Sequence, residues 1–212
     1  MFDKHPILIS FEGVCGSGKS SLINSLKMNY FQNNIPFKRI LKLTDKSHEL
    51  VQNYIFNNIE QFNYSDDCRL FIWWLARKLQ YCEMNIKEYD ILLYDRYYDS
   101  TFAYTPYMTP NAISMNFGLD FLKPDITFYL RFDDLKESLV RNNIDYTDPY
   151  ETANLSQLEN IQSKYDFLYN SIRERCYKLS DNNIHIINAN LSKDDIYSLV
   201  SDKLNSYFNI GG

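Results

Sequence analysis

The chain has 212 residues, of which 45% are hydrophobic and 23% charged, and this composition suits a single globular domain over residues 1–212 with one continuous core. A net charge of −5 and an isoelectric point of about 5.2 exclude the global positive field that binding to polymeric nucleic acid requires. The four cysteines lack CxxC or Cys/His spacing, which excludes a zinc site and a disulfide framework and indicates reduced thiols in a cytoplasmic protein: Cys15, Cys68, Cys82 and Cys176.

The first predicted element is an apolar strand at residues 7–11, which is too short for a signal peptide or a membrane span, so we expect no membrane association. A glycine-rich turn follows it, and the spacing of Leu22, Ile23 and Leu26 predicts a helix over residues 20–29. The next predicted elements are a strand at 37–43 and helices at 49–62 and 67–89.

Three further apolar runs, of the kind that a strand buried on both faces requires, lie at residues 90–94, 125–132 and 183–188. Helical patterns occur after or between them, at 135–141, 155–179 and 192–208. Strands that alternate with helices imply parallel pairing with right-handed crossovers. The sequence therefore predicts an α/β fold of three layers, with helices on both faces of a central, mainly five-stranded parallel sheet.

Between the first strand and the first helix the chain reads "GVCGSGKS" over residues 13–20, which matches the pattern G-x-x-x-x-G-K-[ST] of a phosphate-binding loop. Glycines let successive backbone N–H groups converge on a phosphate, and the following helix adds the positive end of its dipole. Lys19 is expected to reach the β and γ phosphates of a nucleotide, and Ser20 to bind Mg²⁺. A turn that only joins strand to helix does not explain these two residues. The predicted ATP site consists of Gly13, Gly16, Ser17, Gly18, Lys19, Ser20 and Ser21.

Asp95 ends the strand predicted at residues 90–94, and Arg96 follows it directly. In a fold with a phosphate loop, this position places the carboxylate at the carboxyl edge of the sheet, near the metal, and the guanidinium in the same crevice. Taken alone, an Asp-Arg pair at the end of a strand is also typical of a surface ion pair. The two residues are therefore candidates for a metal ligand, alongside Ser20, and for a phosphate-binding group.

Together, these two stretches resemble the thymidylate kinase family. The family's F-E-G before the phosphate loop is matched by residues 11–13, and its D-R-[YFH]-x-x-S-x-x-A-[YF] is matched by residues 95–104. The resemblance spans nearly the whole chain. Shorter matches follow in the family's order: "TDKSHEL" at 44–50, "WWLAR" at 73–77, "KPDITFYL" at 123–130 and "DPYE" at 148–151, within a lid at about 142–154.

The resemblance implies a set of residues that bind the acceptor nucleotide. Lys46 stands where the family keeps a basic residue for the substrate monophosphate, and Trp73 and Arg77 stand where an aromatic residue and an arginine hold the thymine. The latter two are four residues apart and share one helix face. Without the resemblance, a core position is the better explanation of Trp73. The remaining members of the set are Cys15, Arg96, Ser100, Thr101 and Tyr104.

The reaction that the resemblance implies is phosphorylation of dTMP to dTDP by ATP, in a homodimer. Such a transfer requires two phosphates to be aligned and the charge that develops between them to be neutralised. In this interpretation Lys19, Mg²⁺ and a mobile arginine hold the donor, whereas the basic residues of the acceptor set hold the other nucleotide. The residues assigned to catalysis are Glu12, Lys19, Asp95, Arg96 and Arg141.

The chain departs from the family's pattern at three places, of which the least is Thr105, where many members carry Gln. Cys15 replaces the usual acidic residue, which contacts the sugar 3′-hydroxyl. The family places a transition-state arginine in the loop or in the lid, but this chain has Gly16 in the loop and neither Arg nor Lys from residue 142 to 163. Arg141 is the nearest candidate, followed by Arg131. Two alternatives stay open. One is a thymidine-type deoxynucleoside kinase, which shares the fold and the phosphate loop; the other is a nucleotide-binding relative with weak or no kinase activity, which Cys15 and the missing lid arginine favour.

Overall fold

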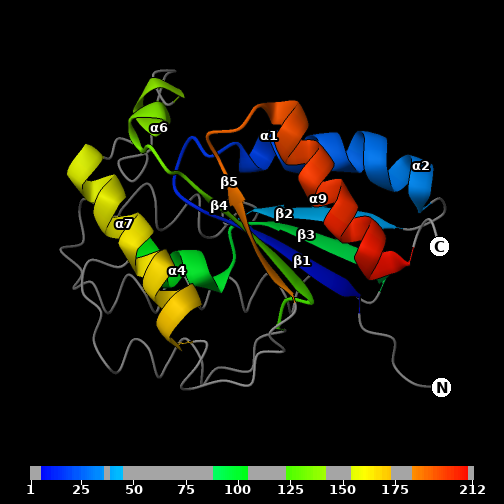
Figure 1. Ribbon diagram of the computed structural model, residues 1–212. Helices are drawn as coiled ribbons and strands as arrows, with labels where there is room; N and C mark the ends of the chain where they lie inside the picture. Colours follow the sequence, from blue (N-terminus) through cyan, green and yellow to red (C-terminus); the bar gives the residue numbers. More distant parts are fainter. Residues whose placement is uncertain are drawn as a thin grey trace, which may run out of the picture.

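The computed structural model describes residues 6–35, 39–44, 88–104, 123–141, 154–172 and 183–209. The predicted helix at 49–62, nearly all of the one at 67–89 and most of the predicted lid lie outside these residues. The described strands form a parallel sheet in the order β2-β3-β1-β4-β5 (Figure 1), which confirms the predicted α/β fold. The strands are β1 (Ile7–Glu12), β2 (Ile40–Thr44), β3 (Ile91–Asp95), β4 (Ile126–Arg131) and β5 (Ile184–Asn188).

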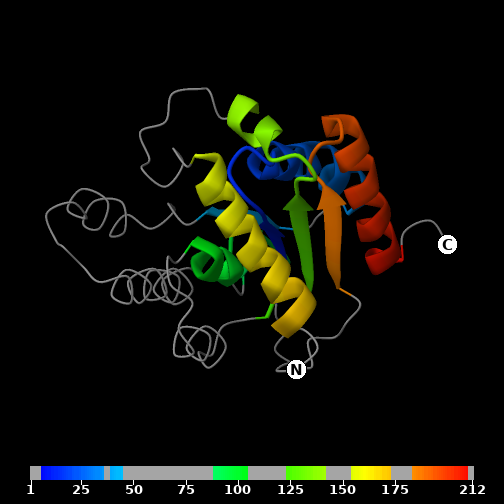
Figure 2. The same ribbon diagram turned by 60° about the vertical axis from the view of Figure 1, so that its left-hand side comes forward.

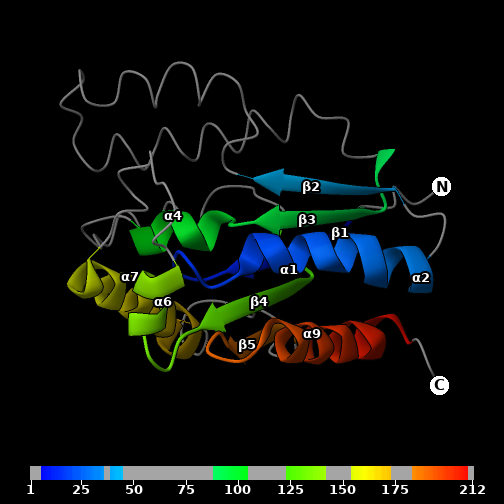
Figure 3. The same cartoon turned by 90° about the horizontal axis from the view of Figure 1, so that it is seen from above.

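β1 lies at the centre of the sheet, between β3 and β4. In the view from above, β2 and β3 lie on one side of α1 (Lys19–Ser25) and β4 lies on the other (Figure 3). Phe11 on β1 is in register with Asp95 on β3 and with Phe128 on β4. Every residue of β3 is buried, as expected for a central strand covered on both faces. Because the strands are parallel, their carboxyl ends meet at one edge of the sheet, and the loops after β1, β3, β4 and β5 begin at that edge.

One face of the sheet is covered by α1 (Lys19–Ser25), the π-helical η1 (Leu26–Phe31), α2 (Gln32–Asn34) and α9 (Lys193–Phe208) (Figure 1). The chain is thus helical from residue 19 to 34, so the helix predicted at 20–29 ends five residues too early. The main core lies between these helices and the sheet. It includes Ile9, Phe11, Leu93, Phe128 and Leu130 from the strands and Leu22, Ile23, Leu26, Val200 and Leu204 from the helices.

The opposite face carries α4 (Tyr98–Tyr104), α7 (Leu155–Phe167) and the π-helical η5 (Leu168–Ile172), as a comparison of Figures 1 and 2 shows. Three tyrosines pack against one another there, with the ring of Tyr129 on β4 5.2 Å from that of Tyr165 and 5.0 Å from that of Tyr169. α6 (Lys136–Arg141) follows β4 at the carboxyl edge. The sequence did not predict α4, although it carries the second motif.

None of the helices in the described part of the chain has the length and apolar character to cross a membrane.

Candidate active site

The glycines of the phosphate loop adopt backbone conformations that other residues rarely reach. Gly13, Gly16 and Gly18 have φ values of 138°, 71° and 89°. A Cβ atom on Gly13 would stand 2.4 Å from the carbonyl oxygen of Leu130 on the neighbouring strand, so a side chain does not fit there. Gly18 directly precedes α1 and lies in open space. The loop therefore turns tightly against β4 and leads into the amino end of a helix, where free backbone N–H groups favour the binding of an anion.

Lys19 folds back over the loop that it follows. Its Nζ donates to the carbonyl oxygens of Gly13 and Val14, at 3.0 and 2.7 Å, and to the hydroxyl of Ser17, at 3.0 Å. The side chain is only 5% exposed. Burial, and next the positive charge of Arg96, lower the pKa of Lys19 to about 8. The ammonium group thus lies in a site that would be stabilised by a bound anion.

Ser20 and Asp95 bring the two sequence motifs together. The hydroxyl of Ser20, on the first turn of α1, donates to the carboxylate of Asp95 at the end of β3. Lys42 on β2 lies beside them, with its Nζ 3.9 Å from the same carboxylate oxygen. Because β2 and β3 run parallel and end at the same edge, the carboxylate is flanked by a hydroxyl and an ammonium group. Sequence reasoning missed Lys42, whose spacing from either motif carries no signal.

Arg96 occupies a strained position directly after β3. Its φ of 69° is unusual for a residue with a Cβ atom and fits a constrained functional residue. Its Nη1 donates to the carbonyl oxygen of Gly13 at 2.9 Å, and its guanidinium carbon lies 4.7 Å from the centre of the Tyr104 ring. Since Lys19 donates to the same carbonyl oxygen, the two cationic nitrogens lie within about 6 Å of each other.

Glu12 ends β1 and is completely buried. Its carboxylate accepts hydrogen bonds from the backbone N–H of Tyr97 at 2.8 Å, from the hydroxyl of Ser100 and from the hydroxyl of Tyr165 at 3.2 Å. Burial, and next the charge of Glu12, raise the pKa of Tyr165, so its hydroxyl stays protonated. These bonds tie the end of β1 to α4 and α7. Tyr165 was not found from the sequence, because nothing links residues 153 positions apart.

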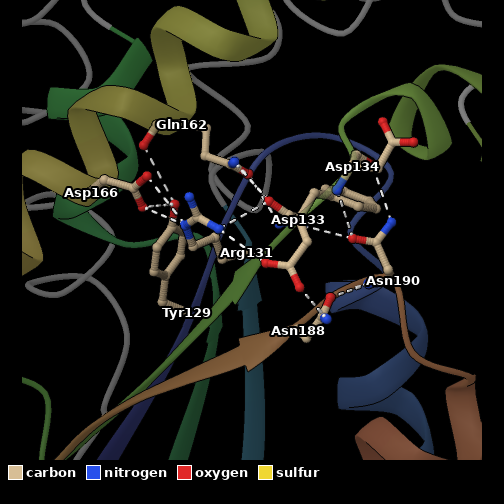
Figure 4. Close-up of polar contacts among 9 residues, drawn as sticks. Tyr129, Arg131, Asp133, Asp134, Gln162, Asp166, Asn188 and Asn190 are labelled. Carbon is tan, nitrogen blue, oxygen red and sulfur yellow. Dashed lines mark hydrogen bonds and ion pairs between the residues drawn. The ribbon is translucent and has the colours of Figure 1, made fainter.

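The two candidate transition-state arginines make contacts outside the phosphate loop. Arg141 donates to the carbonyl oxygen of Ala189 at 2.7 Å and to Glu137 at 2.8 Å. Arg131, at the carboxyl end of β4, is held by Asp166 of α7 at 3.0 Å and by Asp133 at 3.2 Å (Figure 4). Among the described contacts, neither guanidinium reaches the loop.

The structure brings together most of the predicted site residues that it describes. Ser17 and Thr101 are buried, the latter on α4, whereas Ser20 and Ser21 are exposed at the start of α1. Three predicted acceptor residues lie outside the described residues, namely Lys46, Trp73 and Arg77. Around the carbonyl of Gly13 the structure gathers Cys15, Lys19, Arg96 and Tyr104.

Comparisons with known proteins place this chain in a family. A family model described as thymidylate kinase matches residues 11–200. The thymidylate kinase of Mycoplasmopsis pulmonis is 26% identical over 93% of this chain and 87% of its own length. That of Leptospira interrogans is 30% identical over 78% of this chain and 83% of its own length.

A solved structure shows the same fold. The thymidylate kinase of Candida albicans superimposes with a TM-score of 0.72 and 20% identity, over 97% of this chain and 93% of its own. None of these comparisons supports the alternatives that the sequence left open. Since the family model spans most of the chain, this protein belongs to the thymidylate kinase family and is an ATP-dependent nucleoside monophosphate kinase.

Proposed function

We propose that the protein transfers the γ-phosphoryl group of ATP to dTMP at the carboxyl edge of its sheet, with the phosphate loop as the donor site and Arg96 as the centre of the acceptor site. The observation that carries this proposal is the meeting of Lys19 and Arg96 on the carbonyl oxygen of Gly13. Two cations held this close together would bind phosphates of two molecules end to end.

The transfer needs alignment and charge neutralisation more than acid–base chemistry. An oxygen of the dTMP phosphate forms a bond to the γ-phosphorus of ATP, while the bond from that phosphorus to the β,γ-bridging oxygen breaks and its electron pair stays on ADP. Lys19 is proposed to exchange its bonds to the loop oxygens for bonds to the β and γ phosphates. The backbone N–H groups from Gly16 to Ser21 would bind the remaining phosphate oxygens.

The acceptor nucleotide is proposed to lie against α4. Arg96 would hold its phosphate, and Tyr104, whose ring lies under that guanidinium, would close the sugar pocket together with Cys15. Ser100 and Thr101, on the same helix, would supply polar groups to the nucleotide. Lys46, Trp73 and Arg77 keep their proposed roles in binding the phosphate and the thymine.

Ser20 and Asp95 fit a Mg²⁺ ion. Their hydroxyl and carboxylate oxygens already contact each other beside the loop, and both are ligands that Mg²⁺ prefers. At sites of this kind Mg²⁺ is usually held by one or two protein oxygens and by substrate phosphates. When bound, the ion would neutralise part of the negative charge of the β and γ phosphates.

Two further roles are part of the proposal. Glu12, whose carboxylate bonds to the backbone N–H of Tyr97, would fix the turn on which Arg96 stands. Arg141 would leave Ala189 and Glu137 and neutralise the negative charge of the transition state, with Arg131 as the second candidate for this role.

We further propose a single domain, a homodimer and a cytoplasmic location. Sedimentation at micromolar concentration tests the homodimer.

A nucleotide panel tests the reaction. ADP release is measured with ATP, Mg²⁺ and one acceptor at a time: dTMP, dUMP, UMP, dCMP, dGMP or thymidine. We expect the highest kcat/KM with dTMP and near-complete loss of activity in Lys19→Ala. Preference for thymidine, or a loss smaller than about tenfold in Lys19→Ala, would contradict the proposal.

A further inference from the structure

The thiol of Cys15 contacts two residues of the acceptor site at once. Its Sγ lies 3.3 Å from Nη2 of Arg96 and 3.3 Å from the hydroxyl oxygen of Tyr104. We propose that Cys15 is a positioning residue, which together with Tyr104 holds the guanidinium of Arg96 in the orientation that grips the acceptor phosphate. This inference rests on the proposed function and deepens it, because it says how the acceptor site is preorganised.

Four contacts hold Arg96 in place. Its backbone N–H donates to the carbonyl oxygen of Phe11 at 3.0 Å, and its Nη1 donates to Gly13 at 2.9 Å. Its guanidinium lies over the ring of Tyr104, and its Nη2 donates to the thiol. Of the five N–H donors of a guanidinium, these side-chain bonds to described residues engage two. The others are the donors that we assign to the acceptor phosphate.

The sulfur can act only as an acceptor toward Arg96, since a guanidinium only donates. The Tyr104 hydroxyl is the second neighbour of the sulfur, and it stays protonated at neutral pH, because burial raises its pKa. The two contacts therefore set the position of the thiol, which is 4% exposed. A long arginine side chain loses much rotational freedom when it is held in one orientation, and a fixed partner supplies that order before the substrate binds.

A second explanation is that the thiol only fills space inside the loop. The backbone of Cys15 is held separately, since the hydroxyl of Ser138 donates to its carbonyl oxygen at 2.7 Å. If the thiol only fills space, its removal should lower the stability of the protein, and any effect on dTMP affinity should be the same with and without Arg96. Positioning predicts a loss of dTMP affinity that disappears once Arg96 is removed.

A double-mutant cycle separates the two explanations. The dissociation constant for dTMP is measured by calorimetry for wild type, Cys15→Ala, Arg96→Ala and the double variant, with thermal unfolding as a check of folding. We expect Cys15→Ala to weaken dTMP binding about fivefold. This is the effect expected when a charged donor loses one hydrogen bond to a weak sulfur acceptor. In the Arg96→Ala background, the same substitution should change nothing.

Two matched variants complete the test. Cys15→Ser, which keeps a small acceptor, should restore most of the lost affinity. Ser138→Ala disturbs the same loop through its backbone, so any effect that it has on dTMP affinity should be equal with and without Arg96. Equal effects of Cys15→Ala in both backgrounds, or wild-type affinity in Cys15→Ala, would overturn the positioning role. If the wild-type protein does not bind dTMP, the proposed function fails instead.

Discussion

Substitution of Gly13 by alanine tests how closely the phosphate loop is pressed against the sheet. The new Cβ would stand 2.4 Å from the carbonyl oxygen of Leu130, about 1 Å inside ordinary van der Waals contact. That neighbour is backbone in a buried strand, so it cannot turn away as a flexible side chain does. The residue would also keep a φ of 138°, which an L side chain rarely adopts. Gly18→Ala is the matched control, since it has a φ of 89° but no atom within 4 Å of the added Cβ.

The two substitutions therefore differ mainly by the steric term. A left-handed backbone costs a residue with a Cβ atom roughly 1–2 kcal/mol, which is the whole expected effect of Gly18→Ala on the free energy of unfolding. Gly13→Ala adds overpacking against the backbone, which costs roughly 1–3 kcal/mol, to a backbone conformation that is at least as strained. We expect a total loss of about 4 kcal/mol. For a chain of this size, it corresponds to a Tm about 8–16 °C lower, against about 2–8 °C for Gly18→Ala.

Differential scanning calorimetry of the ligand-free proteins measures both shifts without any contribution from nucleotide binding. Circular dichroism before heating shows that each variant is folded. A Tm for Gly13→Ala equal to or above that of Gly18→Ala would refute the steric reasoning, because the added Cβ would then meet no resistance from Leu130.

Two further predictions concern the charge of Lys19 and the support of β4. Burial lowers the pKa of Lys19 to about 8 from 10.5, so between these pH values the unfolded chain binds the proton more tightly and stability rises with pH. From pH 8 to 10, the free energy of unfolding of the wild type, measured by urea titration, should rise by about 2 kcal/mol relative to that of Lys19→Met. Free energies that change in parallel with pH in the two proteins would contradict this. Gln162 accepts from the N–H of buried Phe132 at 3.0 Å and donates to its carbonyl oxygen at 2.9 Å. Gln162→Leu should therefore lower the free energy of unfolding by about 3 kcal/mol, whereas Ser163→Ala, at an exposed position, should change it by less than about 0.5 kcal/mol. Equal losses in the two variants would refute the claim.

The sheet was predictable because its strands leave a strong sequence signal. The run "ILLYD" over residues 91–95 is buried at every position, and its four bulky apolar residues in succession are typical of a strand covered on both faces. Helix α4 had no comparable signal. Asp99, Ser100 and Thr101 are all buried in it, because the helix is enclosed on more than one side and its polar groups contact other protein groups. Such a helix shows no apolar stripe, and periodicity fails.

The phosphate loop and the Asp-Arg pair were predictable as local motifs, and their meeting through Ser20 and Asp95 agrees with parallel strands that end at one edge. The partners of these residues were not predictable. Tyr165 on α7 bonds to Glu12 at the end of β1, and Lys42 reaches Asp95 from the next strand. A single sequence records such pairs only as distant positions of ordinary residue types, so they come from the register of the sheet and the packing of α7.

The end of β4 connects the phosphate loop to α7. On one side, Leu130 leaves no room for a Cβ atom on Gly13; on the other, Gln162 of α7 bonds to both backbone groups of the next-but-one residue, Phe132. Glu12 makes a second connection, since its carboxylate accepts from α7 through Tyr165 and from the turn that carries Arg96. Short contacts among buried groups resist relative movement, because packed interiors have few alternative arrangements. The phosphate loop and Arg96 therefore share one rigid support, and the fold would set the distance between the two phosphates that we propose they bind before either nucleotide arrives.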